Sequence, residues 1–253
     1  MKIFIINVFS ILGYLVIALF SPVLWYQGKS LKIKVPRLPT PSDRPYGFFH
    51  GVGKSFKILG LGESALAGVG IGKHALTLTG LTAAKLNKLI GYNVNWEILA
   101  ESGISLKRLN KLIIHKSDEK FDLVLVSMGG NDVFQLTPPW LWKKNIEICV
   151  RLFFKNEKKP LILFSPVPPV GKFPAIRGPL RIVFGLWENL LQACLAQAIN
   201  SMDNVHLLDV RFPDCKKYYL EDGIHPSSLA YGPWSEKLAI MTVELLKQKK
   251  IGN

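Results

Sequence analysis

Short apolar runs alternate along the chain with longer stretches in which apolar residues recur every three or four positions. Short runs that end in small or polar residues predict buried parallel strands, and the longer periodic stretches predict helices. The predicted strands are Phe56–Gly60, Asn95–Ala100, Leu123–Met128, Pro160–Ser165 and Val205–Asp209, and the predicted helices are His74–Ile90, Leu106–His115, Trp140–Phe154, Leu180–Ser201 and Ser227–Lys247. This alternation predicts a flavodoxin-like three-layer α/β/α fold with a five-stranded parallel sheet in the order 2-1-3-4-5.

The first apolar run is longer than the others. It extends from Ile3 to Tyr26 without a charge, and its roughly 24 residues can cross a hydrocarbon layer of ~30 Å at about 1.5 Å per residue. A cleaved signal peptide has a shorter apolar region of about 7–15 residues and a small-residue cleavage site. The run therefore favours a retained anchor over a cleaved signal or a buried core helix, and we predict a transmembrane helix in residues 1–28.

The segment that follows, residues 29–53, is rich in proline and basic residues and has neither helical nor strand periodicity. Such a composition is typical of an extended, semi-rigid connection. We predict a linker over 29–53 and one globular domain over 54–253.

Lys and Arg outnumber Asp and Glu by 32 to 18, and the net charge of +14 predicts an anionic neighbour such as a phospholipid surface or nucleic acid. Basic groups such as Lys107 and Lys111 lack interleaved aromatic residues, which favours solvated helix faces over a nucleic-acid track. We expect no nucleic-acid partner. Only Lys2 precedes the apolar run, whereas Lys29, Lys32, Lys34 and Arg37 follow it. The positive-inside rule then predicts a single-pass membrane protein with its domain on the cytoplasmic side.

The cysteines and most histidines offer no metal site. Three widely spaced cysteines, Cys149, Cys194 and Cys215, exclude a disulfide framework and a cysteine-built zinc site. His50, His74, His115 and His206 have no partner at metal-ligand spacing and are predicted at the surface or at helix ends. We expect neither a metal ion nor a cofactor.

Distinctive polar clusters follow the first three predicted strands: Gly-Glu-Ser-Ala at 62–65, Ser-Gly-Ile-Ser at 102–105 and Gly-Gly-Asn-Asp at 129–132. A fourth cluster, Asp-Gly-Ile-His-Pro at 222–226, lies before the last predicted helix. The carboxyl ends of parallel strands meet at one edge of a sheet, and ligands bind there. We therefore expect these clusters to share one crevice.

The residue types in these clusters are those of nucleophilic catalysis. A serine hydroxyl needs a neighbouring base, and that base needs a partner that orients it. Ser64, His225 and Asp222 supply the three groups. The backbone N–H of Ser64, the backbone N–H of Gly103 and the amide of Asn131 are candidate donors to the oxygen that becomes negative in the tetrahedral intermediate. Taken singly, each residue is also compatible with an ordinary turn or helix cap, and the glycine-rich stretch lacks the Lys-Ser/Thr pair of a phosphate-binding loop.

Together the clusters resemble the SGNH/GDSL hydrolase family, whose name-giving Ser, Gly, Asn and His lie in separate blocks. The resemblance covers about residues 56–247. It implies that Ser64 is the nucleophile, that His225 is the general base and then acid, and that Asp222 orients His225. It also implies that Gly103 and Asn131 are oxyanion donors beside the Ser64 N–H.

One position departs from the family pattern, because the usual Gly-Asp-Ser is Gly-Glu-Ser here and Glu63 adds a methylene next to Ser64. No catalytic role is assigned to Glu63. The aromatic and proline-rich stretches at 138–142 and 166–173 are expected either to form an acyl pocket or membrane-facing lip, or to pack beneath a loop.

The expected function is hydrolysis of acyl esters or thioesters, with lipid-like substrates such as lysophospholipids, through an acyl-serine intermediate. Two alternatives stay open. One is a carbohydrate O-deacetylase of the same family, and the other is a non-catalytic, membrane-tethered module that binds acyl chains or headgroups. The sequence does not predict an oligomeric state.

Overall fold

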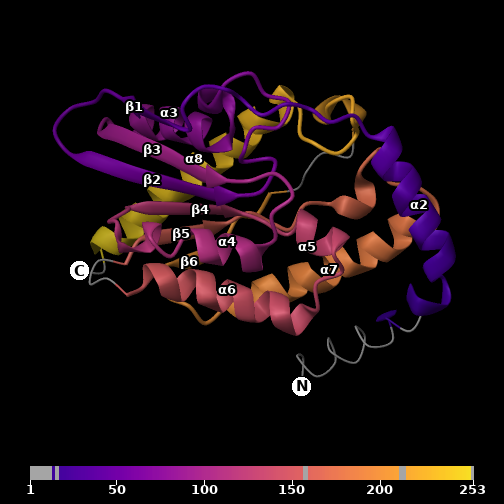
Figure 1. Cartoon of the computed structure of the whole chain (residues 1–253). Coiled ribbons are helices and arrows are strands. Elements are labelled where there is room, and N and C mark those ends of the chain that lie inside the picture. The colour runs from indigo at the N-terminus through magenta and orange to yellow at the C-terminus, as the bar shows by residue number, and fades with distance from the viewer. Residues whose placement is uncertain (1–12, 15–16, 156–158, 211–214, 252–253) are drawn as a thin grey trace.

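A six-stranded sheet forms the middle layer of the computed structural model, which describes residues 13–14, 17–155, 159–210 and 215–251 (Figure 1). Its order is β1-β3-β2-β4-β5-β6. The strands are β1 (Tyr46–Phe49), β2 (Ser55–Gly62), β3 (Asn93–Ala100), β4 (Leu123–Ser127), β5 (Leu161–Phe164) and β6 (Val205–Leu207). Strands β2 to β6 are parallel and have the predicted order 2-1-3-4-5, whereas β1 is antiparallel to β3.

The prediction of five strands, all parallel, is therefore wrong by one strand. The missed strand β1 comes from the proline-rich stretch that was predicted as a linker, where four extended residues give too short a pattern to stand out. Gly47 explains how β1 fits, since a Cβ there would lie 2.6 Å from the Trp96 ring on β3. The missing side chain lets β1 cover the edge of the sheet.

Helices cover both faces of the sheet (Figure 1). Alternate residues of β4 point to opposite sides: Val124 and Val126 join one hydrophobic cluster, and Leu123 and Leu125 join the other. The helices packed on the two faces are α3 (Leu78–Ile90) and α8 (Ser228–Ile251) on one, and α4 (Leu106–Leu112), α5 (Gly130–Phe134), α6 (Pro139–Phe153) and α7 (Gly178–Ile199) on the other. This confirms the three-layer α/β/α arrangement.

Within the described residues, α7 is the one helix that is long and apolar enough to cross a membrane. Its buried residues include Trp187, Leu191 and Leu195, which belong to the hydrophobic cluster beneath the sheet. Burial in the core accounts for the apolar character of this side of α7.

The predicted transmembrane helix lies partly outside the described residues, which omit 1–12 and 15–16. What is described shows a break in the apolar run, because Phe20 leaves helical geometry with φ −95° and ψ 8° and a new helix, α2 (Ser21–Lys34), begins after it. Pro22 sits in the first turn of α2, where its missing N–H costs no hydrogen bond. The transmembrane helix stays a prediction.

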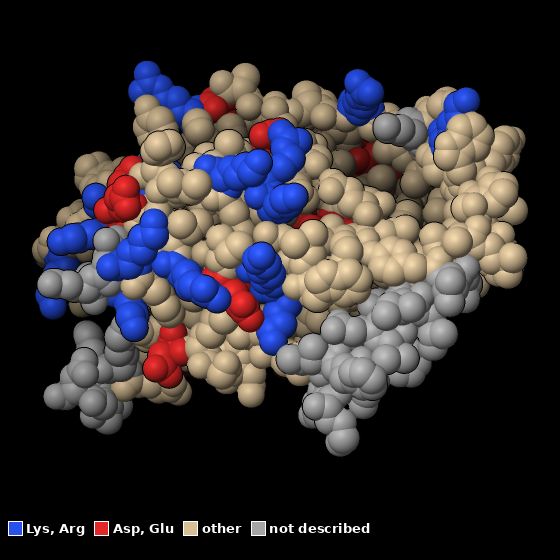
Figure 2. Space-filling model, turned by 60° about the horizontal axis from the view of Figure 1, so that its bottom comes forward, with Lys and Arg blue, Asp and Glu red and all other residues tan. Residues whose placement is uncertain are grey.

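Helix α2 packs along α7, beyond the end of the sheet where α5 lies (Figure 1). The Gln27 side chain accepts a hydrogen bond of 3.2 Å from the Leu180 N–H, and the Tyr14 hydroxyl donates one of 2.7 Å to the Leu136 carbonyl. Figure 2 shows one face of the molecule, turned by 60° from the view of Figure 1. On this face Lys and Arg gather mainly over the half that lies away from α2.

The residues between α2 and β2 also pack on the domain. The Pro39 carbonyl accepts a hydrogen bond of 2.8 Å from the Gly70 N–H, and Asp43 lies 2.8 Å from His74 Nδ1. His74 begins a short 3-10 helix, as expected of a helix-end histidine, but it is buried. Residues 39 and 43 thus join the segment between α2 and β2 to the loop that carries the candidate serine and to the short helix after it.

Candidate active site

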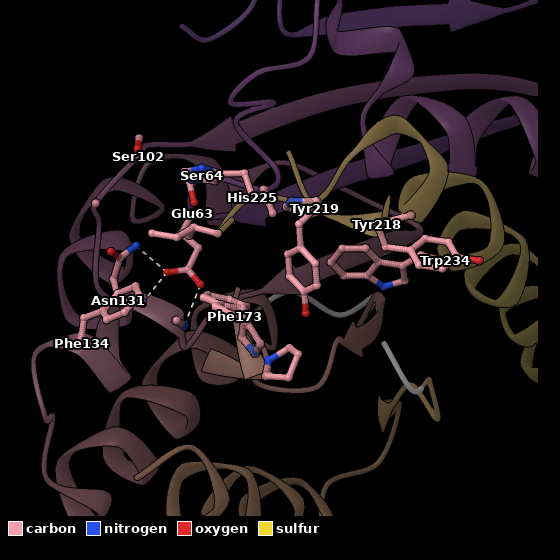
Figure 3. Close-up of a pocket in the computed structure, with 18 residues that line it drawn as sticks. Glu63, Ser64, Ser102, Asn131, Phe134, Phe173, Tyr218, Tyr219, His225 and Trp234 are labelled. Atoms are coloured by element: carbon pink, nitrogen blue, oxygen red, sulfur yellow. Dashed lines mark hydrogen bonds between the residues drawn. The ribbon is translucent and has the colours of Figure 1, made fainter. Parts of the chain in front are cut away.

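A pocket of about 210 Å³ lies at the carboxyl ends of the parallel strands (Figure 3). Four of the predicted residues, Ser64, Gly103, Asn131 and His225, line this pocket, and Asp222 is bonded to His225 behind it. Residues that are up to about 160 positions apart in the sequence therefore meet at one edge of the sheet, as the parallel order requires.

Ser64 lies on the tight turn that follows β2. The Glu63 carbonyl accepts hydrogen bonds from the N–H groups of Leu66 and Ala67, at 3.0 and 2.9 Å, and these bonds turn the chain away from the strand. Gly62 is required here, because a Cβ would lie 2.5 Å from the Leu66 side chain. The turn holds Ser64 at the pocket wall.

His225 is fixed by Asp222 in the loop before α8. The Asp222 carboxylate bonds to His225 Nδ1 and accepts the N–H groups of Ile224 and His225, at 2.9 and 3.0 Å. Burial raises the pKa of Asp222, but the hydrogen bonds from the His225 ring and from the two backbone N–H groups outweigh it, so the net pKa is lowered. With Nδ1 bonded to this carboxylate, Nε2 is the ring nitrogen left for the pocket.

Gly103 and Asn131 stand on the neighbouring loops. Gly103 has φ +81° with open space around its missing Cβ, so its backbone conformation, rather than crowding, favours glycine. The buried Asp132 joins the two loops: it accepts the Leu106 N–H at 3.0 Å, at the start of α4, and the Thr137 hydroxyl at 2.9 Å. Burial raises the pKa of Asp132 to about 6, against the lowering effect of these two donors.

Glu63 is buried and binds the Asn131 loop. One carboxylate oxygen accepts the Gly130 N–H at 2.7 Å, and the other accepts the Asn131 N–H at 2.9 Å and the Asn131 side-chain amide at 2.6 Å (Figure 3). A Cβ at Gly130 would lie 2.9 Å from the carboxylate, so the glycine leaves room for the longer acid. Burial raises the pKa of Glu63 to about 7. The three hydrogen-bond donors lower this pKa, and the negative charge of the nearby Asp132 raises it.

The remaining lining is mostly apolar and aromatic. Pro168, Pro169 and Phe173 line the pocket. This agrees with the expectation that the 166–173 stretch forms an acyl pocket. Trp142 does not line it, since it is buried and donates to the Leu191 carbonyl at 3.0 Å. The lining residues outside the sequence clusters and stretches singled out above are Phe134, Tyr218, Tyr219, Ala230 and Trp234. The Tyr218-Tyr219 pair shortly before Asp222 is the signal that could have found two of them.

Comparison with known proteins decides the family. The GDSL-like lipase/acylhydrolase family matches residues 61–232, which contain all five predicted site residues. The chain belongs to this family. The resemblance drawn from the four sequence clusters is thereby confirmed, and the chain is an esterase- or lipase-type hydrolase of the GDSL family.

Individual relatives of the GDSL family agree with this assignment. A spore germination lipase, LipC, from Bacillus licheniformis is 25% identical over 198 residues, which cover 70% of this chain and 92% of the lipase. Among solved structures, the lipase Lip_vut3 from a goat rumen metagenome has a TM-score of 0.58 at 21% identity. The matched region covers 72% of this chain and 95% of the Lip_vut3 chain. A family 3 carbohydrate esterase from Clostridium thermocellum has a TM-score of 0.59 at 15% identity, and the matched region covers 77% of this chain and 98% of the esterase chain. These two structures share the fold.

Proposed function

We propose that this protein is a serine hydrolase in which Ser64, His225 and Asp222 form the catalytic triad. The observation that carries the proposal is the shared pocket: Ser64 and His225 line it together, and the His225 ring is held from behind by Asp222. A hydroxyl beside an imidazole that a buried carboxylate orients is the arrangement that activates serine.

The reaction follows from this arrangement. His225 Nε2 takes the hydroxyl proton as Ser64 Oγ attacks the carbonyl carbon, held about 3 Å away in the bound substrate. The tetrahedral intermediate collapses as the bond to the leaving oxygen or sulfur breaks, and His225 gives its proton to the leaving group. A water molecule then attacks the acyl-serine, again with His225 as base, and the acid departs while Ser64 regains its proton.

The charge on the intermediate is stabilised, in this proposal, by the N–H groups of Ser64 and Gly103 and by the Asn131 amide. One Asn131 amide hydrogen is bonded to Glu63, which leaves the second for the oxyanion. We expect Asn131→Ala to lower kcat by roughly 10²–10³-fold with little change in KM, because the donor acts mainly in the transition state. A loss below about tenfold in steady-state kinetics would show that the amide lies elsewhere.

Glu63 has a testable effect of its own. Since the pKa of the buried acid is about 7 rather than the ordinary 4.5, Glu63 loses its proton later in the folded state than in the unfolded state. The free energy of unfolding should therefore fall as the pH rises from about 4.5 to about 7. We expect Glu63→Gln to remove this part of the pH dependence, measured by urea unfolding. The same variant should lower kcat by roughly tenfold or more, since its amide puts a donor where an acceptor is needed.

The lining of the pocket favours an acyl chain. Phe134, Phe173, Tyr219 and Trp234 offer apolar surface to a substrate whose carbonyl lies at Ser64. We propose acyl esters or thioesters with lipid-like groups, including lysophospholipids, as the substrate class, and the relation to a spore germination lipase supports it. A carbohydrate O-deacetylase is the second candidate, since the fold is shared with a carbohydrate esterase. Rates across a panel of acyl-chain lengths, one thioester and one acetylated sugar separate these candidates.

A fluorophosphonate probe tests the chemistry directly, because it phosphonylates only an activated serine. We expect stoichiometric labelling that disappears in Ser64→Ala and persists in Ser102→Ala, the matched change at the other serine of the pocket. A folded wild-type protein that stays unlabelled would instead favour the non-catalytic binding module.

We also propose that the N-terminal segment, residues 1–28, keeps the protein on the membrane with its domain on the cytoplasmic side. The uncharged run and the basic residues after it support this placement. Protease added outside intact cells should spare the domain and should degrade it once the membrane is opened. Degradation in intact cells would contradict the proposed orientation.

A further inference from the structure

The outer side of the N-terminal segment exposes a row of large apolar side chains. The exposed fractions are 76% for Leu19, 50% for Phe20, 48% for Val23, 67% for Trp25 and 70% for Tyr26. The inner side is covered by the domain, since Leu24 belongs to a hydrophobic cluster of the core and Tyr14, Ile17 and Leu31 pack against it. The helix is thus apolar on both sides while protein covers only one. A contiguous apolar surface of this kind marks an interaction site.

Helix α7 continues this surface. Ile182 and Leu186, one turn apart on α7, are 66% and 62% exposed. Val183 and Leu190 are half-buried, and they lie on α7 between this exposed pair and the buried side of the helix that packs on the core. Contacts of Gln27 with Leu180 and of Tyr14 with Trp187 place α7 antiparallel to the N-terminal segment. We name the exposed side chains of both elements the apolar platform: Leu19, Phe20, Val23, Trp25, Tyr26, Ile182 and Leu186.

The charges around the apolar platform are mainly basic, since the groove beside Tyr26 holds Lys34, Arg177 and Lys216 against one exposed acid, Glu221. No Asp or Glu precedes Asp43 in the sequence, and Glu188, the one acid of α7, is half-buried and accepts the Gly171 N–H. Lys29 lies 5.2 Å from the centre of the Trp25 ring, and Arg177 and Arg181 are exposed at the start of α7. An apolar surface with aromatic residues and a basic border matches the interface of an anionic bilayer.

The apolar platform also lies behind the pocket. Leu24 and Phe173 belong to the same hydrophobic cluster, and Phe134 and Ile224 pack against that cluster. Phe134, Phe173 and Ile224 line the pocket from the other side. The Phe134 ring also lies 5.3 Å from the ring of Phe184 on α7, so α7 and the apolar wall of the pocket belong to one packed core.

We propose that the apolar platform is the surface with which the domain lies on an anionic phospholipid bilayer, so that the apolar wall of the pocket is held next to lipid. The inference rests on the proposed membrane association and adds the face and the orientation. Helix α2 is hydrogen-bonded to α7, and Pro39, which follows α2, is hydrogen-bonded to Gly70 in the serine loop. The N-terminal segment therefore holds the domain in one orientation and does not act as a loose tether. A second copy of the chain fits less well, since two platforms face to face would bring together borders in which basic residues outnumber acidic ones.

Fluorophores at two matched positions test which face meets lipid. The full chain carries Cys215→Ser, which removes the exposed cysteine and leaves two buried ones, together with either Leu186→Cys or Ile240→Cys. Position 240 is 44% exposed on α8, on the other face of the sheet. Each protein is mixed with vesicles of phosphatidylglycerol and phosphatidylcholine. We expect the label at 186 to shift to shorter wavelength and to be quenched by a lipid-borne quencher, and the label at 240 to stay in water.

Two outcomes of the labelling experiment would overturn the proposed face without overturning the membrane association. One is a label at 186 that stays in water although the protein sediments with the vesicles. The other is a label at 186 that is protected without lipid in a concentration-dependent way, which would assign the face to a second copy. A protein that does not sediment with vesicles at all would overturn the membrane association as well. Hydrolysis of a water-soluble ester, measured on the same samples, tests the proposed chemistry separately.

A pair of double variants gives a functional readout. We expect Ile182→Glu with Leu186→Glu to slow hydrolysis of a vesicle-borne ester by at least about tenfold, because two large apolar side chains no longer leave water. Hydrolysis of the soluble ester should stay within about twofold, since exposed positions seldom affect folding. The matched control is Leu89→Glu with Ile240→Glu, at exposed apolar positions of α3 and α8. Equal losses in the two double variants would contradict the inference.

Discussion

Ser64→Ala should abolish ester hydrolysis, with kcat lower by about 10⁶-fold, because the acyl-enzyme of the proposed mechanism forms on the Ser64 hydroxyl beside His225. His225→Ala should cause a loss of similar size, since the two residues act as a unit and each is ineffective alone. The double variant should therefore be no slower than either single one. Steady-state rates on a soluble ester, with active-site titration of the wild type, measure the three losses.

A control separates chemistry from folding in this experiment. Ser64 lies on a turn whose hydrogen bonds are made by backbone groups, so the alanine variant should unfold at the same temperature as the wild type. An alanine variant that keeps its melting temperature and more than about a hundredth of the wild-type rate would show that another residue is the nucleophile.

Asp222→Asn should lower kcat by about 10⁴-fold with the fold intact. The Asp222 carboxylate accepts a bond from His225 Nδ1, which leaves Nε2 free to take the proton of Ser64. An amide can present its N–H to the ring instead, which favours the tautomer with Nδ1 unprotonated and Nε2 unable to act as base. The loss should lie in kcat, measured at saturating substrate.

Asp203→Asn is the matched control, because this carboxylate is exposed in the turn before β6 and lies outside the pocket. Its rates should equal those of the wild type. Asp222 also has a lowered pKa, so its hydrogen bonds stabilise the fold at neutral pH and are lost as the pH falls through that pKa. Equal rates for Asp222→Asn and the wild type would remove Asp222 from the proposed triad.

The parallel part of the sheet could be predicted because its central strands β2, β4 and β5 contain buried apolar runs with turn residues at their ends. Leu123–Ser127, for example, is buried at every position. The same order brought the candidate residues together, since strands that run in parallel leave their loops at one edge. Strand β1 gave no such signal, because its four residues alternate between exposed and half-buried positions beside several prolines.

The contacts of Glu63 could not be predicted from the sequence either. Its carboxylate bonds to residues 67 and 68 positions further on, and no local pattern encodes a side chain that crosses from one strand end to the next. The aromatic residues Tyr218 and Trp234 reach the pocket through the fold of the last loop and helix. Sequence clusters identified the proposed triad and oxyanion groups and the 166–173 stretch, whereas the rest of the apolar lining required coordinates.

The pairing of β1 with β3 matters for the design of shortened proteins. A recombinant fragment that starts at residue 54, the predicted start of the domain, lacks Tyr46–Phe49 and so uncovers the backbone N–H and C=O groups along one border of β3. It also removes Asp43, the partner of the buried His74. Uncovered strand borders of this kind recruit other chains, so such a fragment is prone to aggregate, whereas a fragment that retains Asp43 and β1 keeps both contacts.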